Sequence, residues 1–263
     1  MERYINNSIF REYDIRGIVK DDFNDSLVED IGRAYGTILR KNNFKDISVS
    51  GDIRSTTPRL KKNIIKGLIS TGVNVYDLGI LPTPANYFSL FKTKVKNSIQ
   101  ITGSHNPSNY NGFKISYNKK PFYGKSIQEL KKIIIKGGFI KSNTEGLIFK
   151  RNILNDYNSY LISLFDFNSN IKVSMDCGNA SACLTAPEIY ENLGIHVNAL
   201  FCDVDSSFPN HHPDPTVDSN LSKLIEDVLK NKSNLGVAFD GDADRLIVVD
   251  NLGRIIRSDI LIG

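Results

Sequence analysis

The chain contains 263 residues, of which 40% are hydrophobic and 24% are charged. This length predicts two domains of ordinary size, and the composition excludes a disordered or fibrous protein because enough apolar residues are present to build a core. The net charge of +4 is too small and too dispersed to indicate nucleic-acid binding, so we expect no nucleic-acid partner.

The first half of the chain predicts alternating helices and strands. Ser26 followed by Glu29 forms a capping-box pattern, and apolar residues then recur at helical spacing as far as Leu39. Thr57 and Pro58 indicate the start of a second helix, since proline is favoured in the first turn. The other elements expected here are strands at 47–50, 73–76 and 98–101, a turn at 82–84 and a short helix after it.

A domain boundary is expected near residue 150. The segment Lys136–Lys150 contains three glycines among polar residues, and the α/β alternation restarts after it. The elements expected beyond it are strands at 171–175, 196–201, 237–239 and 246–249 and helices at 181–192 and 221–229. We therefore predict an α/β protein whose domains, 1–150 and 151–256, each hold a mixed β-sheet flanked by helices.

The cysteines and the apolar segments indicate which cellular compartment to expect. The three cysteines form no CxxC pair, so neither a disulfide framework nor a zinc site is indicated and a reducing, cytoplasmic setting is expected. The N-terminal residues lack an apolar segment of the signal-peptide kind, and no apolar run reaches the roughly 20 residues of a membrane span. We expect neither export nor a membrane partner.

The segment Thr102–Pro107 has the composition of a reactive loop. Gly103 permits close backbone approach, Ser104 offers a hydroxyl nucleophile, and His105 supplies a polar contact before Pro107 stiffens the exit. The alternative is an ordinary Asn-Pro turn, since Ser, Asn, Gly and Pro are the commonest turn residues. We expect the loop to continue as far as Lys114.

A second segment carries Asp240, Asp242 and Asp244 at the end of an apolar strand. Carboxylate oxygens suit Mg²⁺ or Ca²⁺, but an EF-hand is excluded because Arg245 stands at its sixth position and Asn251 at its twelfth. The alternative is a solvated acidic turn. Three carboxylates within five residues repel one another unless a cation compensates, which favours a metal site.

Several basic residues are candidates for holding phosphate, because arginine offers a planar fork of donors and lysine a point charge. The alternative is that they only keep the surface soluble. These residues are Arg11, Arg16, Arg54 and Lys114. The adjacent His211 and His212 suggest a structural loop more than a transition-metal site, because no further ligand stands at a suitable spacing.

Taken together, these motifs resemble the α-D-phosphohexomutase family, in particular its bacterial phosphomannomutase/phosphoglucomutase branch. The similarity covers essentially the whole chain and rests on four segments in the same order: Phe10–Gly17, Thr102–Lys114, Pro209–Pro215 and Asp240–Arg245. The resemblance implies two successive phosphohexomutase-type domains, the first with the serine loop and the second with the metal loop.

The resemblance also implies a phosphoprotein isomerase of carbohydrate metabolism. Ser104 would carry a phosphate and exchange it with a phosphorylated hexose through a hexose 1,6-bisphosphate, so that phosphate moves between C1 and C6. One Mg²⁺ would be held by Asp240, Asp242 and Asp244 together with Ser104. The basic residues expected around the phosphoserine are Arg16, Lys114 and Arg245, and Tyr13 and His105 match positions lining the same site.

Family members contain four domains, whereas residues 257–263 match only the start of the third. We therefore expect a fragment whose missing partners are domains III and IV, which recognise the sugar and clamp its second phosphate. The alternative is a noncatalytic phosphosugar- or metal-binding module. A phosphatase-like or kinase-like transferase is less favoured, because no nucleotide-binding Gly-x-x-x-x-Gly-Lys-Ser/Thr loop is present. The resemblance implies mannose phosphate, glucose phosphate or both as substrates, and glucosamine phosphate stays open as a further option.

Overall fold

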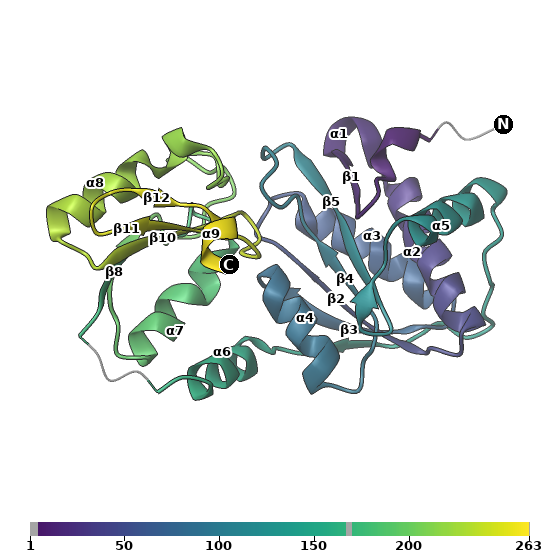
Figure 1. Ribbon diagram of the computed structural model, residues 1–263. Coiled ribbons are helices and arrows are strands. Elements are labelled where there is room, and N and C mark those ends of the chain that lie inside the picture. The colour runs from purple at the N-terminus through teal and green to yellow at the C-terminus, as the bar shows by residue number, and fades with distance from the viewer. Residues whose placement is uncertain (1–4, 167–169, 263) are drawn as a thin grey trace. The chain divides into compact units, whose positions relative to one another are not determined.

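The computed structural model describes residues 5–166 and 170–262, which form two compact units (Figure 1). The first unit holds the described residues up to Ile80 together with Ala85–Gly103 and Asn109–Asn152. The second unit holds Leu81–Pro84, Ser104–Ser108 and the described residues from Ile153 onward. Two short segments from the first half of the chain, one of them the serine loop, thus belong to the same compact body as the aspartate loop.

The first unit is built on a mixed sheet in the order β1-β5-β4-β2-β3-β7, with β6 paired to β5. Neighbours from β4 to β7 run parallel, while β5 is antiparallel to both β1 and β4. The strands are β1 (Ile15–Ile18), β2 (Asp46–Gly51), β3 (Asn74–Ile80), β4 (Ser98–Ile101), β5 (Tyr110–Tyr117), β6 (Lys120–Pro121) and β7 (Ile148–Lys150). The helices are α1 (Val19–Asp22), α2 (Asp25–Lys41), α3 (Thr57–Ile69), α4 (Thr83–Lys92) and α5 (Lys125–Lys136).

The two faces of this sheet differ in chemistry. Helices α2, α3 and α5 cover one face (Figure 1) and share an apolar core with Ile47 and Val49 of β2. The alternate residues of β2, Ser48 and Ser50, face α4, where the Asn86 side-chain amide donates to Ser50 Oγ at 2.6 Å. The polar layer under α4 is fully buried and internally hydrogen-bonded, which fixes the position of α4 on the sheet.

The second unit contains a smaller mixed sheet in the order β12-β11-β10-β8-β9, with α7 and α8 on opposite faces (Figure 1). Its strands are β8 (Lys172–Asp176), β9 (His196–Leu200), β10 (Leu235–Phe239), β11 (Leu246–Asp250) and β12 (Ile255–Ile256). Its helices are α6 (Leu154–Ser163), α7 (Ala186–Asn192), α8 (Ser222–Asn231) and α9 (Ser258–Ile262), with short 3₁₀ turns before α7 and α8. The predicted α/β class with helix-flanked mixed sheets is confirmed.

Some of the predicted elements are wrong in detail. Helix α2 is capped by Asn24, whose side chain accepts from the Leu27 N–H at 2.9 Å, and not by Ser26. The expected helix at 181–192 is a 3₁₀ turn followed by α7, because Pro187 lies in the first turn of a separate helix. The serine loop does not continue to Lys114, since β5 begins at Tyr110.

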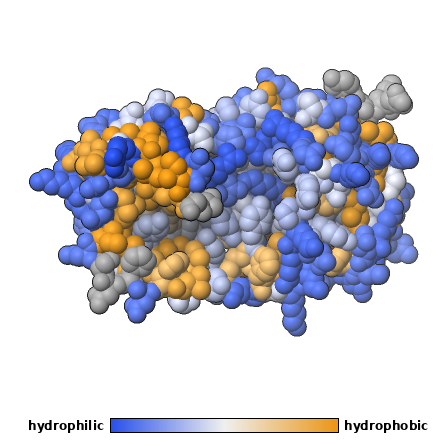
Figure 2. Space-filling view, in the orientation of Figure 1, coloured by the Kyte–Doolittle hydropathy of each residue, from blue (hydrophilic) through white to orange (hydrophobic). Residues whose placement is uncertain are grey.

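Exposed apolar side chains gather on the second unit over α8, β12 and α9, where Figure 2 shows a hydrophobic surface. They include Leu229, Leu252, Ile260 and Leu261, which are 48–66% exposed. Contiguous apolar surface of this kind often marks an interaction site.

Among the residues that the structure describes, no helix is both long enough and apolar enough to cross a bilayer.

Candidate serine loop and metal centre

The aspartate loop is the turn of a β-hairpin between the antiparallel strands β10 and β11. Ala243 adopts a left-handed φ of 60°, and its N–H donates to the Asp240 carbonyl at 3.0 Å, which tightens the turn. The side chains of Asp240 and Asp242 are buried, whereas Asp244 is exposed. One carboxylate oxygen from each of the three residues lies within 4.8 Å of the others. The hairpin therefore converges three carboxylates on one point.

Backbone donors hold Asp240 from within the same turn. Its Oδ1 accepts from the N–H groups of Asp244 at 3.1 Å and Arg245 at 3.2 Å. Because both bonds fall on Oδ1, the carboxylate is oriented by its own loop. The Arg245 side chain itself is exposed.

Thr83, at the start of α4, holds Asp242. Its hydroxyl donates to the Asp242 carboxylate, and its N–H donates to the Asp242 carbonyl at 2.9 Å. Thr83 is fully buried. Sequence reasoning missed this residue, since the Pro82-Thr83-Pro84 segment indicated only a turn and the contact spans 159 positions.

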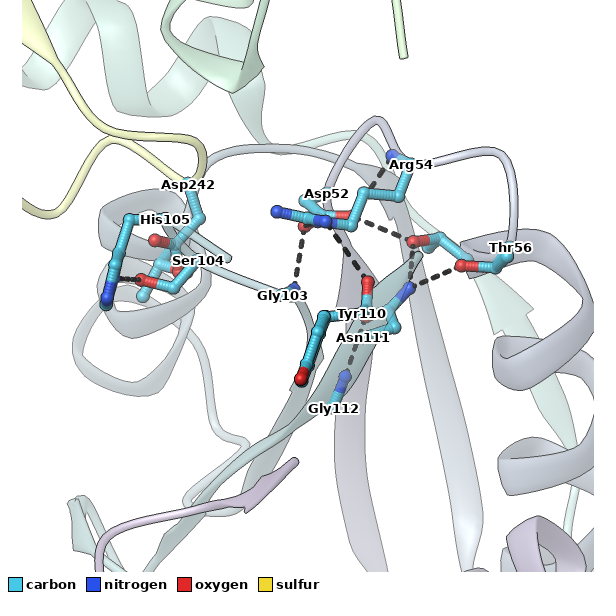
Figure 3. Close-up of polar contacts among 12 residues, drawn as sticks. Asp52, Arg54, Thr56, Gly103, Ser104, His105, Tyr110, Asn111, Gly112 and Asp242 are labelled. Carbon is cyan, nitrogen blue, oxygen red and sulfur yellow. Dashed lines mark hydrogen bonds and ion pairs between the residues drawn. The ribbon is translucent and has the colours of Figure 1, made fainter. Parts of the chain in front are cut away.

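Ser104 lies directly against the acidic loop. Its Oγ donates to Asp240 Oδ2 at 3.1 Å. The same Oγ lies 3.3 Å from His105 Nδ1 (Figure 3). Ser104 is buried and takes a left-handed φ of 51°, a conformation that costs a serine free energy and persists only where its surroundings impose it. The structure thus brings together Ser104, His105 and the three aspartates.

The donor set fits a hard divalent cation. Three carboxylates and a serine hydroxyl supply only oxygen ligands, the type that Mg²⁺ and Ca²⁺ prefer. Two of the carboxylates are fully buried, so their mutual repulsion is little screened by water. A bound cation would offset this repulsion.

Gly241 allows the two loops to approach. A Cβ at this position would overlap the Ser104 carbonyl oxygen, which is a backbone atom that cannot rotate away. We expect Gly241→Ala to lower the free energy of unfolding by about 1–3 kcal/mol, because the loops must separate. Urea unfolding measures this loss. The matched control is Gly138→Ala, where nothing lies within 4 Å, and equal losses in the two variants would contradict the prediction.

The residue before Ser104 is held by a buried polar network in the first unit (Figure 3). The Gly103 N–H donates to Asp52 Oδ2 at 3.1 Å, and the same oxygen accepts from Arg54 Nε at 3.1 Å. Arg54 also donates to the Tyr110 carbonyl at 3.1 Å. A Cβ on Gly103 would overlap the Arg54 guanidinium, so a larger residue there would displace Arg54 from this network. Arg54, a candidate for phosphate binding by sequence, is 2% exposed and contributes these contacts to the loop.

The other candidate residues lie in the first unit. Arg16 is buried, pairs with Asp14 and donates to the Gly103 carbonyl at 3.4 Å, so it reaches the peptide that joins Gly103 to Ser104. Lys114 lies on β5 opposite Gln100 of β4 and is half-buried. Arg11 is exposed, as is Tyr13 at 76%, with its ring 6.2 Å from that of Tyr123.

His211 has a partner that the sequence did not indicate. Its Nε2 lies 2.9 Å from Asp176 Oδ2, and its Nδ1 donates to the His212 carbonyl at 2.9 Å. Burial lowers the pKa of His211, but the hydrogen bond and charge of Asp176 outweigh burial and leave the pKa raised. Both ring nitrogens face acceptors, so the pair favours the imidazolium.

This raised pKa predicts a pH dependence of stability. A group whose folded pKa exceeds its unfolded pKa stabilises fully below the unfolded value, about 6.5 for histidine, and loses that contribution as pH rises through the folded value. We expect the free energy of unfolding to fall over that window in the wild type and to fall less in His211→Gln. Urea unfolding across the pH range checks this. If the free energy of unfolding falls as much in the variant as in the wild type, the pH dependence comes from other groups.

Comparison with known proteins identifies the family of this chain. Residues 7–141 match "Phosphoglucomutase/phosphomannomutase, alpha/beta/alpha domain I", and residues 155–253 match domain II of the same description. The chain therefore belongs to the phosphoglucomutase/phosphomannomutase family, which confirms the resemblance drawn from the four sequence segments.

Individual members of this family show how much of a relative's length the chain matches. A phosphoglucomutase of Neisseria meningitidis is 38% identical over 255 residues, covering 97% of this chain and 55% of that protein. A phosphomannomutase/phosphoglucomutase of Pseudomonas putida is 40% identical over 260 residues, with the same two coverages. A crystal structure of a phosphoglucomutase/phosphomannomutase family protein from Burkholderia thailandensis has a TM-score of 0.93 and 35% identity, covering 97% of this chain and 57% of that one. The chain thus spans little more than half the length of these proteins.

Proposed function

We propose that this chain carries the phosphoserine and metal parts of a phosphohexomutase, which interconverts hexose 1-phosphate and hexose 6-phosphate of mannose, glucose or both. Ser104 carries the phosphoryl group, and a hexose 1,6-bisphosphate is the intermediate. The observation that carries the proposal is the 3.1 Å contact between Ser104 Oγ and Asp240 Oδ2, beside two further aspartates. A nucleophile and a cation-binding oxygen cluster at one point suit phosphoryl transfer.

The surrounding groups suit each step of that reaction. Asp240 accepts the Ser104 hydroxyl proton in a hydrogen bond, and the His105 ring provides a second proton site next to the same oxygen. The left-handed φ of Ser104 directs its side chain to the acidic loop, and Asp52 fixes the preceding amide. The basic residues proposed to offset phosphate charge are Arg16, Lys114 and Arg245, and Tyr13 is proposed to line the substrate site.

Asp240, Asp242, Asp244 and Ser104 are the residues that would hold Mg²⁺. When bound, the cation would neutralise charge on the phosphoryl group and polarise it. Thr83 prepares Asp242 for this role, because its hydroxyl donates to the carboxylate and its N–H donates to the Asp242 backbone carbonyl.

The half-reaction tests the proposal. The chain, mixed with the C-terminal part of the Pseudomonas putida relative, is incubated with glucose 1,6-bisphosphate and Mg²⁺, and its intact mass is measured. We expect a gain of one phosphate in the wild type and no gain in Ser104→Ala. The matched control Ser108→Ala, at the exposed end of the same loop, keeps the gain.

Two outcomes oppose the proposal. An intact Ser104 that stays unphosphorylated when the C-terminal part is present contradicts the phosphoserine. Phosphorylation without any isomerisation of glucose or mannose phosphates in the same mixture favours the alternative, a noncatalytic phosphosugar- or metal-binding module. Restored isomerisation, lost again in Ser104→Ala, opposes that alternative.

A further inference from the structure

The three cysteines of the chain gather at one end of the second unit's sheet, although 25 positions separate the first from the last. Cys177 directly follows β8, Cys202 follows β9, and Cys183 lies in the 3₁₀ turn before α7. All three side chains belong to one apolar cluster, in which Cys202 Sγ lies 3.8 Å from the Met175 carbonyl of β8 and Cys183 Sγ lies 3.5 Å from the Phe201 carbonyl. Cys177 is fully buried, and Cys183 and Cys202 are partly exposed. The cluster therefore has one inner thiol and two that reagents can reach.

The strand register explains why Cys177 and Cys202 meet. Strands β8 and β9 are parallel with Asp176 opposite Leu200, so Cys177 lies opposite Phe201 and diagonal to Cys202. The Cys177 N–H donates to the Leu200 carbonyl at 3.2 Å, so the two segments stay side by side one residue beyond β8.

The direction of the Cys202 side chain also favours a contact with Cys177. Alternation along a regular strand would send Cys202 to the face opposite Cys177. Phe201, however, has a left-handed φ of 52°, which breaks the alternation and turns its own ring onto His211 at 5.3 Å. Cys202 consequently joins the same apolar cluster as Cys177, and its thiol lies 3.3 Å from the Leu200 carbonyl.

The two thiols differ in reactivity. The hydrogen bond from Cys177 lowers the pKa of Cys202 and outweighs burial, which raises it. The pKa of Cys177 is raised by its hydrogen bonds to Cys183 and Cys202 and by burial. Cys202 is therefore the better nucleophile, and Cys177 is placed to attack it afterwards.

We infer that Cys177 and Cys202 form a dithiol that a low-molecular-weight disulfide, such as glutathione disulfide, converts reversibly to an intramolecular disulfide. The Cys202 thiolate attacks one sulfur of the reagent, forming a mixed disulfide and releasing one glutathione thiolate. Cys177 then loses its proton to solvent and attacks the Cys202 sulfur. The second glutathione leaves as thiolate, so the protein loses two electrons and two protons while the reagent becomes two thiols.

The bridge would lie next to a turn that contacts the acidic hairpin. Cys177 begins the turn that ends at Ser181, whose N–H donates to the Gly241 carbonyl at 3.3 Å. The bridge would also close a loop of the unfolded chain, so the oxidised protein is expected to melt roughly 5–10 °C higher, reversibly with dithiothreitol.

The test uses the folded chain incubated with glutathione disulfide, followed by alkylation of the remaining thiols and peptide mapping. We expect a peptide pair linked through Cys177 and Cys202, with Cys183 alkylated. Cys183→Ser, the matched control, keeps the link. Cys177→Ala stops at a stable glutathione adduct on Cys202, and Cys202→Ser forms no link.

Three results would overturn the inference. One is a wild-type glutathione adduct that never resolves to the internal link. Another is a link that uses Cys183, and the third is equal alkylation of all three thiols after treatment. If Cys177→Ala fails to fold because Cys177 is buried, the peptide maps of the wild type and of Cys183→Ser still test the inference.

Discussion

Replacing Asp242 with asparagine should remove most of the stabilisation that the proposed Mg²⁺ site gives this chain. The substitution keeps the shape of the side chain and leaves an oxygen to accept the Thr83 hydroxyl, but it deletes one of three converging charges. We expect Mg²⁺ affinity to fall about a hundredfold, because ligand charge sets affinity for hard cations. At a Mg²⁺ concentration 100 times the wild-type Kd, the wild type gains about 2.7 kcal/mol and the variant gains much less.

In the absence of Mg²⁺, the same substitution should not destabilise the protein. Without Mg²⁺ the deleted charge relieves repulsion between buried carboxylates, so Asp242→Asn should be no less stable than the wild type. Thermal unfolding with and without Mg²⁺ measures both effects. Glu226→Gln, on the exposed surface of α8, is the control and should keep the full gain. An undiminished gain in Asp242→Asn would show that Mg²⁺ binds elsewhere.

The motifs that could be predicted from sequence are contiguous. Ser104 with His105, and the three aspartates, each stand within a few positions of one another, so the sequence marks a candidate nucleophile and a candidate cation site, although an ordinary turn stays open for the first. That the two loops meet was only an expectation from the family resemblance. The contact of Ser104 with Asp240 spans 136 positions, and no local pattern encodes it.

The residues missed by sequence analysis act over long separations. Thr83, Asp52 and the thiol cluster each carry ordinary local signals, such as a turn or an isolated cysteine. Cys177 and Cys202 form no CxxC pair, and they meet only because β8 and β9 are parallel neighbours. A sheet register is a property of the tertiary structure, so it could not be derived from spacing along the chain.

Errors at element boundaries have local causes. Asn24 and Ser26 are both good helix caps, and the side chain that reaches the Leu27 N–H decides between them. The sequence predicts a loop at the start of β5, because Asn111 and Gly112 are turn residues. Asn111 is nevertheless buried, and its side-chain amide donates to Thr56 and Thr57, so tertiary hydrogen bonds override its turn preference.

Asp52→Asn should be the most damaging substitution in the first unit. Asp52 and Arg54 are 1% and 2% exposed, so the ion pair is almost dry. Asp52 Oδ1 accepts from the Thr57 hydroxyl at 2.8 Å, while Oδ2 accepts from Gly103 and Arg54. An asparagine amide must place its NH₂ group against donors on one of these sides, leaving the Arg54 charge uncompensated. We expect a loss of about 3–5 kcal/mol in the free energy of unfolding.

An exposed ion pair provides the matched comparison. Asp25 pairs with Arg59 in the same unit, but their side chains are 65% and 41% exposed, so Asp25→Asn should cost less than about 1 kcal/mol. Urea unfolding compares the two variants at equal m-value. Asp52→Asn should also slow the proposed phosphoryl uptake by Ser104, because the amide that Asp52 releases belongs to the preceding Gly103. If Asp52→Asn costs no more than Asp25→Asn, the buried network does not hold the serine loop, and Ser104 owes its left-handed backbone to the acidic hairpin alone.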